Sequence, residues 1–383
     1  MTKLFSLCLL LIVIVGCELF EKDVKPFEKC PLTMISKGAY SDKNSQEVGV
    51  IFEAFDCDNN PVGITASDVT GYEVIGGERK PLRTESKAAF YSIKGKYIAA
   101  AILVLDTSGS IVQNSGVFSK LKSAAKGFAQ KLLSGSDAMV SVVVFDGRQY
   151  AFLASLPSGQ NVFSKYSEVS TLIDGLNCGA VINAVGPDKL CEDSSTNLYN
   201  AVLTGADLSK TLKNFVIQEG IIPADGIYSG NVILFTDGTD EANYVSLAQA
   251  KSGIAQNSSF TNFFTIGLAS ADINPDILKQ LGPDGYYSAD NESQLASQFD
   301  QIASRLNKLA NNIKRYAYCT ATRNGNVTFE LVHNESGEKL TYNFNAGTKG
   351  VACNLGSSSN SGRIGYSQEI ESSFKLNFSP KAY

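Results

Sequence analysis

The chain has 383 residues, of which 44% are hydrophobic and 19% are charged. This length suits two or three domains, and the composition is that of a globular protein rather than a disordered or fibrous one. The formal net charge of −5 argues against a strongly basic nucleic-acid binder. Because His333 is the only histidine, a zinc site built from several histidines is excluded.

The N-terminus has the plan of an export signal. Residues 1–16 contain one basic residue, Lys3, followed by an apolar run that is too short to span a membrane comfortably. The run ends in Ile14-Val15-Gly16-Cys17, which resembles the lipobox of bacterial lipoproteins. An ordinary signal peptide with a chance cysteine is the alternative interpretation.

The lipobox resemblance implies cleavage before Cys17, a diacylglyceride on its thiol and an acyl chain on its amine. Several acyl chains form a stable membrane anchor. The polar residues 17–29 would then be a tether between the lipid and the folded part. We therefore expect an exported, lipid-anchored protein of the bacterial cell envelope, in the outer membrane rather than the inner one.

Export changes how the cysteines are interpreted. Cys8 would leave with the signal and Cys17 would carry lipid, which leaves six cysteines in a compartment that can be oxidising. Six cysteines allow 15 connectivities. Their grouping along the chain favours the pairs Cys30–Cys57, Cys178–Cys191 and Cys319–Cys353.

Two stretches have the pattern of β structure. Residues 30–96 contain short strand-like runs separated by turn signals, and residues 317–383 alternate apolar and polar side chains, with a final strand expected over 374–378. Each stretch alone has only a few strands, which is marginal without a partner sheet. We therefore expect both stretches to share one β-sandwich, into which the intervening domain is inserted.

Residues 97–316 alternate between strands and helices. The run 98–105 is continuously apolar, which is typical of a strand buried on both faces of a parallel sheet. Further strands are expected at 139–145, 150–156, 231–236 and 263–268, and helices at 117–132, 163–176, from 197 onward, and at 295–313. This order predicts an α/β domain with a doubly wound, mostly parallel sheet, flanked by the sandwich segments.

The loop after the first buried strand reads Asp106-Thr107-Ser108-Gly109-Ser110, a D-x-S-x-S motif. It lies at the carboxyl end of a parallel strand, where open α/β sheets bind ligands. A carboxylate and two hydroxyls are hard oxygen donors that suit Mg²⁺, Mn²⁺ or Ca²⁺. The motif alone is a weak indication of a metal site. However, Asp237 follows the strand at 231–236, and Thr196 precedes the helix from 197. Both are expected at the same sheet edge.

With these three loops, residues 97–316 resemble a von Willebrand factor A (vWA) domain. The metal-ion-dependent adhesion site of that family consists of D-x-S-x-S, a threonine in a later loop and an aspartate after the fourth strand. The resemblance implies that hydroxyls of Ser108, Ser110 and Thr196 ligate a divalent cation, held also by Asp106 and Asp237 directly or through water. The resemblance implies that the cation is Mg²⁺, with Mn²⁺ or Ca²⁺ as alternatives. It also implies that one coordination position of the cation is open to a carboxylate of the ligand.

These expectations describe a membrane-anchored adhesion lipoprotein. It would capture a protein or extracellular-matrix ligand that presents an acidic residue. We do not expect it to bind nucleic acid. The alternative is a cell-envelope scaffold whose vWA domain binds proteins without a metal. We do not expect an enzyme, because the site offers no general base apart from the ligating acids.

The loop between Cys178 and Cys191 lies just before Thr196 in the sequence. A disulfide there would hold a partly apolar segment beside the metal loops. Exposed Val181, Ile182, Val185 or Leu190 would supply the apolar anchor that an interface needs beside a polar centre. Packing of this loop onto its own domain is the alternative.

Overall fold

The structure is a computed structural model that describes residues 32–41, 46–58, 60–92, 97–135, 137–178, 190–222, 226–322, 324–346, 353, 355 and 374–378. The predicted signal, Cys17, the tether and Cys30 lie outside these residues. Within them, none of the helices has the length and apolar character needed to cross a membrane.

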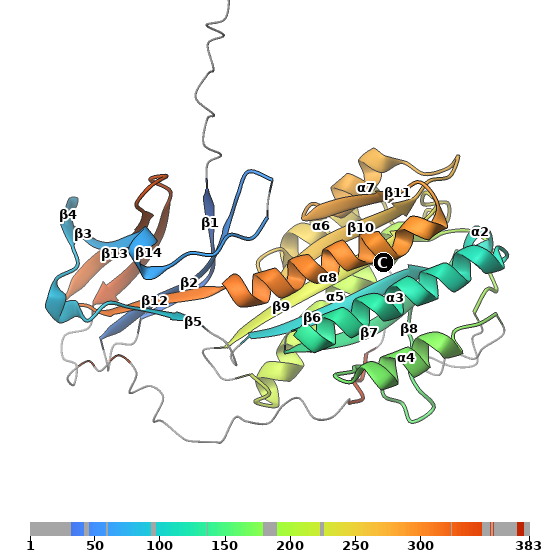
Figure 1. Ribbon diagram of the computed structural model, residues 1–383, viewed down its shortest axis with the longest axis horizontal. Helices are drawn as coiled ribbons and strands as arrows, with labels where there is room; N and C mark the ends of the chain where they lie inside the picture. Colours follow the sequence, from blue (N-terminus) through green and yellow to red (C-terminus); the bar gives the residue numbers. More distant parts are fainter. Residues whose placement is uncertain are drawn as a thin grey trace, which may run out of the picture.

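A six-stranded sheet forms the centre of the larger domain (Figure 1), with the strand order β11-β10-β9-β6-β7-β8. Its strands are β6 (Tyr97–Asp106), β7 (Ala138–Phe145), β8 (Phe152–Leu153), β9 (Ile227–Thr236), β10 (Thr261–Leu268) and β11 (Gly285–Ala289). All neighbours are parallel except the edge pair of β7 and β8. Every residue of β6, β7 and β9 is buried, as their apolar runs predict for central parallel strands.

Helices cover both faces of this sheet. They are α2 (Gly109–Val112), α3 (Ser115–Gly135), α4 (Tyr166–Gly175), α5 (Leu198–Gln218), α6 (Leu247–Asn257), α7 (Pro275–Leu281) and α8 (Leu295–Asn312), with a short η3 (Glu292–Gln294) before α8. Side chains of α3, α4 and α8 share one apolar core, and those of α5, α6 and α7 share another. Successive residues of β6 alternate between the two cores, so the predicted doubly wound α/β fold is confirmed.

Some predicted elements differ from the structure in length or number. The edge strand expected at 150–156 is reduced to β8, and the helix expected at 163–176 begins only at Tyr166. The sequence interpretation also lacked α6, α7 and β11. Helix α6 nevertheless has a local signal, because the Ser246 hydroxyl accepts a hydrogen bond from the Gln249 N–H and the Gln249 side chain accepts one from the Ser246 N–H.

Two antiparallel four-stranded sheets lie beside the larger domain (Figure 1), ordered β1-β2-β12-β5 and β14-β13-β3-β4. Their strands are β1 (Thr33–Ser41), β2 (Glu47–Phe55), β3 (Val69–Ile75), β4 (Glu78–Pro81), β5 (Ala89–Ser92), β12 (Lys314–Cys319), β13 (Gly325–His333) and β14 (Lys339–Ala346), with short helices η1 (Ala66–Asp68) and η2 (Thr84–Ser86). Each sheet combines strands from before and after the α/β domain. One apolar core, including Phe52 and Phe329, contains residues of both sheets.

The C-terminal segment Phe374–Phe378 lies against the α/β domain and not in the two small sheets. Phe374 forms a single bridge with Val162, with N–H to O distances of 3.0 and 3.2 Å. The Asn161 side chain accepts from the Leu376 N–H and donates to the Leu376 carbonyl, and the ring of Phe374 stacks on Phe215. The expected strand is therefore reduced to one bridge. Its partner is Val162, whose neighbour Phe163 bridges Val140 of β7.

Candidate metal site

The D-x-S-x-S loop is held in place by the ends of three strands. Asp106, the last residue of β6, is fully buried, and its Oδ1 accepts a hydrogen bond of 2.8 Å from the Ser108 N–H. Its Oδ2 accepts one of 2.6 Å from the hydroxyl of Thr236 at the end of β9. Thr107 donates from both N–H and hydroxyl to the Phe145 carbonyl at the end of β7. The loop is thus anchored on both sides by hydrogen bonds within the protein itself.

Ser110 connects this loop to the predicted aspartate. Its hydroxyl donates a hydrogen bond of 2.9 Å to Asp237 Oδ1, and it lies 3.4 Å from the hydroxyl of Ser108. Ser108 is fully buried, whereas Ser110 is exposed. Four of the five predicted residues therefore form one connected group, which faces solvent at Ser110.

Thr196, the fifth predicted residue, lies beside the Asp237 loop. A methyl group added at Gly238 would be 3.5 Å from the Thr196 hydroxyl. The Thr196 carbonyl accepts hydrogen bonds from the N–H groups of Glu241 and Ala242, at 2.8 and 3.2 Å. The loop before α5 and the loop after β9 are therefore held together by backbone contacts, which place the threonine at the predicted edge.

The electrostatics of this group suit a cation. Burial raises the pKa of the Asp106 carboxyl to about 7, and Asp237 adds to that rise through charge repulsion. Burial also raises the pKa of Asp237, and Asp272 acts in the same direction. Among the residues that the structure describes, neither Asp106 nor Asp237 has a lysine or arginine partner. Two poorly solvated acids and three hydroxyls fit a hard divalent ion, which would supply the missing positive charge.

The described residues contain no group of three or more His, Cys, Asp or Glu side chains that could hold a metal ion by themselves. The group at this edge has only two acids, and its other three members contribute hydroxyl oxygens. The five residues together would hold the cation.

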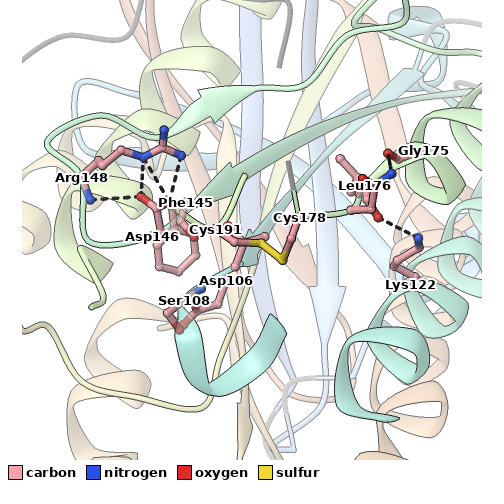
Figure 2. The surroundings of a disulfide bond; sticks show 12 residues. Asp106, Ser108, Lys122, Phe145, Asp146, Arg148, Gly175, Leu176, Cys178 and Cys191 are labelled. Carbon is pink, nitrogen blue, oxygen red and sulfur yellow. Dashed lines mark hydrogen bonds and ion pairs between the residues drawn. A yellow bond between two sulfur atoms is a disulfide. The ribbon is translucent and has the colours of Figure 1, made fainter. Parts of the chain in front are cut away.

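Sequence reasoning missed one buried acid at the same edge that is not among the five predicted residues. Asp146 directly follows β7 and is fully buried, and Arg148 pairs with it through contacts of 2.8 to 3.1 Å (Figure 2). The Asp146 carbonyl accepts from the Asn197 N–H, and the Asn197 side chain donates to the Arg148 carbonyl. Asp146 and Arg148 therefore brace the loop that carries Thr196. The sequence contains a signal for Asp146, because it follows the apolar run 139–145 as Asp106 follows the run 98–105.

The Cys178–Cys191 disulfide is confirmed, with Cα atoms 5.3 Å apart, and it lies close to Asp106 and Ser108 (Figure 2). The second predicted pair, Cys319–Cys353, is confirmed as well. Val181, Ile182 and Val185 lie outside the described residues. Leu190 is only 2% exposed and packs in the core, so for this residue the alternative of packing onto its own domain holds, and the exposed anchor does not.

A scan against protein-family models and a search of curated proteins found no match to this sequence. Similar solved structures include proximal thread matrix protein 1 from the mussel byssus, with 15% identity and a TM-score of 0.39 over 60% of this chain and 49% of that one. A von Willebrand factor type A protein from Catenulispora acidiphila has 13% identity and a TM-score of 0.43, over 83% and 74% of the two chains.

The vWF domain of the type V pili tip protein Mfa5 from Porphyromonas gingivalis is also similar, with 13% identity and a TM-score of 0.38 over 55% of this chain and 95% of that domain. The chain spans about half the length of the mussel protein. The doubly wound sheet and the D-x-S-x-S loop at its carboxyl edge are those that the resemblance to a vWA domain implied.

Proposed function

We propose that the chain is an adhesion-type binding protein that captures a protein or extracellular-matrix ligand through a divalent cation. The main support is the group described above, in which Asp106, Ser108, Ser110 and Asp237 are connected by hydrogen bonds and Thr196 lies beside the Asp237 loop. A cation held by these residues would attract a carboxylate of the ligand from the solvent side. The proposal includes no catalysis.

Hydrogen bonds within the chain already orient the two acids that would hold the cation. Thr236 and the Ser108 N–H orient the Asp106 carboxylate, and Ser110 orients Asp237. These fixed contacts place the acids before binding, so little reorganisation is needed. An acidic ligand group would be recognised from the side of Ser110, because Asp106 and Ser108 are fully buried.

The test is capture of ligand from an extracellular-matrix extract by the immobilised protein, with Mg²⁺ or with EDTA. We expect capture by the wild type in Mg²⁺ and its loss in EDTA and in Asp106→Ala. The matched control is Asp174→Ala, which removes an exposed acid of α4 that pairs with Lys126. Capture that is insensitive to EDTA and to Asp106→Ala would contradict the metal-dependent function.

A metal-independent scaffold is the second candidate, and one observation favours it. Both Asp106 oxygens and Asp237 Oδ1 already accept hydrogen bonds from neighbouring groups. The loops therefore have an internal network that needs no cation to hold its shape. In that case EDTA would leave partner capture intact, which is the outcome that separates the two candidates.

We also propose that the protein acts from a lipid anchor at Cys17 in the bacterial envelope, in the outer membrane rather than the inner. The support is the lipobox-like sequence after an apolar run. Changing Cys17→Ala should move the protein from the detergent phase to the aqueous phase in a detergent phase separation. Unchanged partitioning of this variant would refute the anchor.

A further inference from the structure

The segment Phe374–Phe378 lies on the α/β domain, at the edge of the sheet beyond β7 (Figure 1). It is contacted there by Asn161, Val162 and Phe215, the last of which lies in the final turn of α5. We call the surface formed by these three residues the edge site. Residues 347–373 separate the segment from β14, so the contact joins parts of the chain that are distant in sequence.

The backbone of the segment pairs with the edge site as a strand does. The Phe374 N–H donates to the Val162 carbonyl at 3.0 Å, and the Val162 N–H donates to the Phe374 carbonyl at 3.2 Å. The Asn161 side chain accepts a hydrogen bond of 2.8 Å from the Leu376 N–H and donates one of 3.0 Å to the Leu376 carbonyl. Asn161 is only 5% exposed, so this clamp is shielded from water. Main-chain bonds of this kind hold extended peptides at sheet edges.

Alternate side chains of the segment face the domain. Leu376 is 5% exposed, Phe374 and Phe378 are half-buried, and the two residues between them are exposed. The three inward side chains pack with the apolar core that includes residues of α5. The ring of Phe374 stacks on Phe215, with centroids 4.6 Å apart. The edge site therefore fits an extended peptide with the pattern Phe-x-Leu-x-Phe.

None of these contacts depends on the covalent connection between the segment and the α/β domain. The same main-chain bonds and the same stacking can form with these residues of another molecule. A tether raises the effective concentration of the chain's own segment, which therefore binds first in dilute solution. A segment held by one bridge and one side-chain clamp opens more easily than the whole domain unfolds, because it has few bonds to break.

We propose that the edge site recognises the segment Phe374–Phe378 between molecules as well as within one. When the chain's own segment opens, the same segment of a second copy docks in its place. The proposal is independent of the adhesion function. The edge site lies near the amino end of β7, because Val162 adjoins Phe163, which bridges Val140, whereas the candidate metal site lies at the carboxyl ends of the strands.

The first test uses a labelled synthetic peptide of residues 373–379, titrated into the full chain and followed by fluorescence anisotropy. The receptor is Leu376→Asp, which puts a charge at a buried position and so releases the chain's own segment. We expect saturable binding to this variant. Binding to the wild type should be weaker by about tenfold or more, because its own segment competes.

Changes within the peptide test the pattern without altering the protein. Alanine in place of Leu376 should weaken binding about tenfold or more, because a buried side chain loses its packing. Alanine in place of Lys375 or Asn377 is the matched control and should leave affinity unchanged, since both residues are exposed. Equal effects of the leucine and lysine changes would overturn the inference.

Hydrogen exchange of the wild type provides a readout that needs no variant. Excess peptide should speed exchange of the chain's own Leu376 N–H, because the segment is displaced. The Val162 N–H should stay protected, because the peptide accepts the same hydrogen bond. If excess peptide leaves the Leu376 N–H as protected as before, the segment is a fixed part of the fold and the inference is wrong.

Docking between copies is tested by mixing two variants. Leu376→Asp provides an edge site, and Asn161→Ala provides a segment released from its clamp. We expect a 1:1 complex in sedimentation velocity for the mixture, and monomers for each variant alone. Replacing Asn161→Ala by Asn311→Ala, which alters an exposed asparagine of α8, should give monomers only. The inference is overturned if the peptide does not saturate Leu376→Asp, or if the first mixture stays monomeric above the dissociation constant of the peptide.

Discussion

The hydroxyl of Ser110 donates a 2.9 Å hydrogen bond to Oδ1 of Asp237, across 127 positions of sequence. One loop follows β6 and the other follows β9, which are neighbouring parallel strands. The contact therefore depends on the sheet order and not on any local motif. A cation at this edge would take the place of the hydroxyl proton as the partner of Asp237.

The first prediction is that Asp106→Asn abolishes Mg²⁺ and Mn²⁺ binding in calorimetric titrations. The two carboxylates supply most of the charge that would balance the ion, so losing one removes the main attraction. Ser108→Ala should weaken binding less, because water can replace a neutral ligand. Asp174→Asn is the control and should bind like the wild type. Wild-type affinity in Asp106→Asn would contradict the site.

The same variant should not destabilise the protein in EDTA. Asp106 is fully buried, and burial raises its pKa to about 7, so its charged form is unfavourable in the fold. Asparagine keeps the shape and removes the charge. We expect an unchanged or higher free energy of unfolding, measured in urea. A large loss would show that the carboxylate itself stabilises the loop.

The second prediction concerns Lys37 and pH. Burial raises the pKa of Glu53 despite the ammonium of Lys37 nearby. The folded protein thus holds this proton more tightly than the unfolded chain, and this contribution to stability falls as pH rises above the usual Glu value, about 4.3. Lys37→Met leaves the buried carboxylate without a partner. It should cost about 3 kcal/mol near neutral pH and little near the usual Glu value.

Urea unfolding of Lys37→Met at both pH values checks this. The control is Lys279→Met, which breaks an ion pair whose side chains are 59% and 85% exposed. That change should be below about 0.5 kcal/mol at either pH, since exposed pairs contribute little. A Lys37→Met effect that does not depend on pH would contradict the assignment.

The third prediction compares the Cys178–Cys191 disulfide with the Cys319–Cys353 disulfide. The double variant Cys178→Ser, Cys191→Ser should lose about 3 kcal/mol of stability, as expected for a loop of this length, and should bind Mn²⁺ more weakly. The disulfide lies beside Asp106 and Ser108, so its loss loosens the same edge. The pair Cys319–Cys353 is the control, because Cys319 belongs to β12 of the small sheet. Its removal should reduce stability and leave cation affinity unchanged.

The fourth prediction uses two glycines. A Cβ at Gly109 would lie 2.9 Å from Ser194 Cβ, closer than such atoms normally approach, so Gly109→Ala should push the Asp106 and Thr196 loops apart. We expect weaker Mn²⁺ binding although no ligand is removed. Gly127 in α3 is exposed, and a Cβ added there would meet no neighbouring atom within 4 Å, so Gly127→Ala should add about 0.5–1 kcal/mol to the free energy of unfolding and leave binding unchanged. Equal Mn²⁺ affinity in both variants would refute the argument.

The sequence alone determined the elements whose signal is local. The apolar run of β6 predicted a central strand because both of its faces are buried, and the spacing of Leu121, Ala125, Phe128 and Leu132 predicted α3. The D-x-S-x-S loop is also a local feature, since it follows directly from the end of that strand. The edge strand β8 was overestimated because residues 150–156 are mostly apolar, whereas only Phe152 and Leu153 pair with β7.

Tertiary structure decided which loops and surfaces meet. Thr236 binds Asp106 and Arg148 braces the Thr196 loop only because β9, β6 and β7 are neighbours in the sheet. Leu190 was buried by packing that its own loop sequence does not encode. The cavity of about 440 Å³ that Lys37 of β1 and Lys213 of α5 both line forms only because a small sheet and a helix far apart in the chain approach each other. Such contacts depend on the packing of whole elements, which the local sequence pattern does not specify.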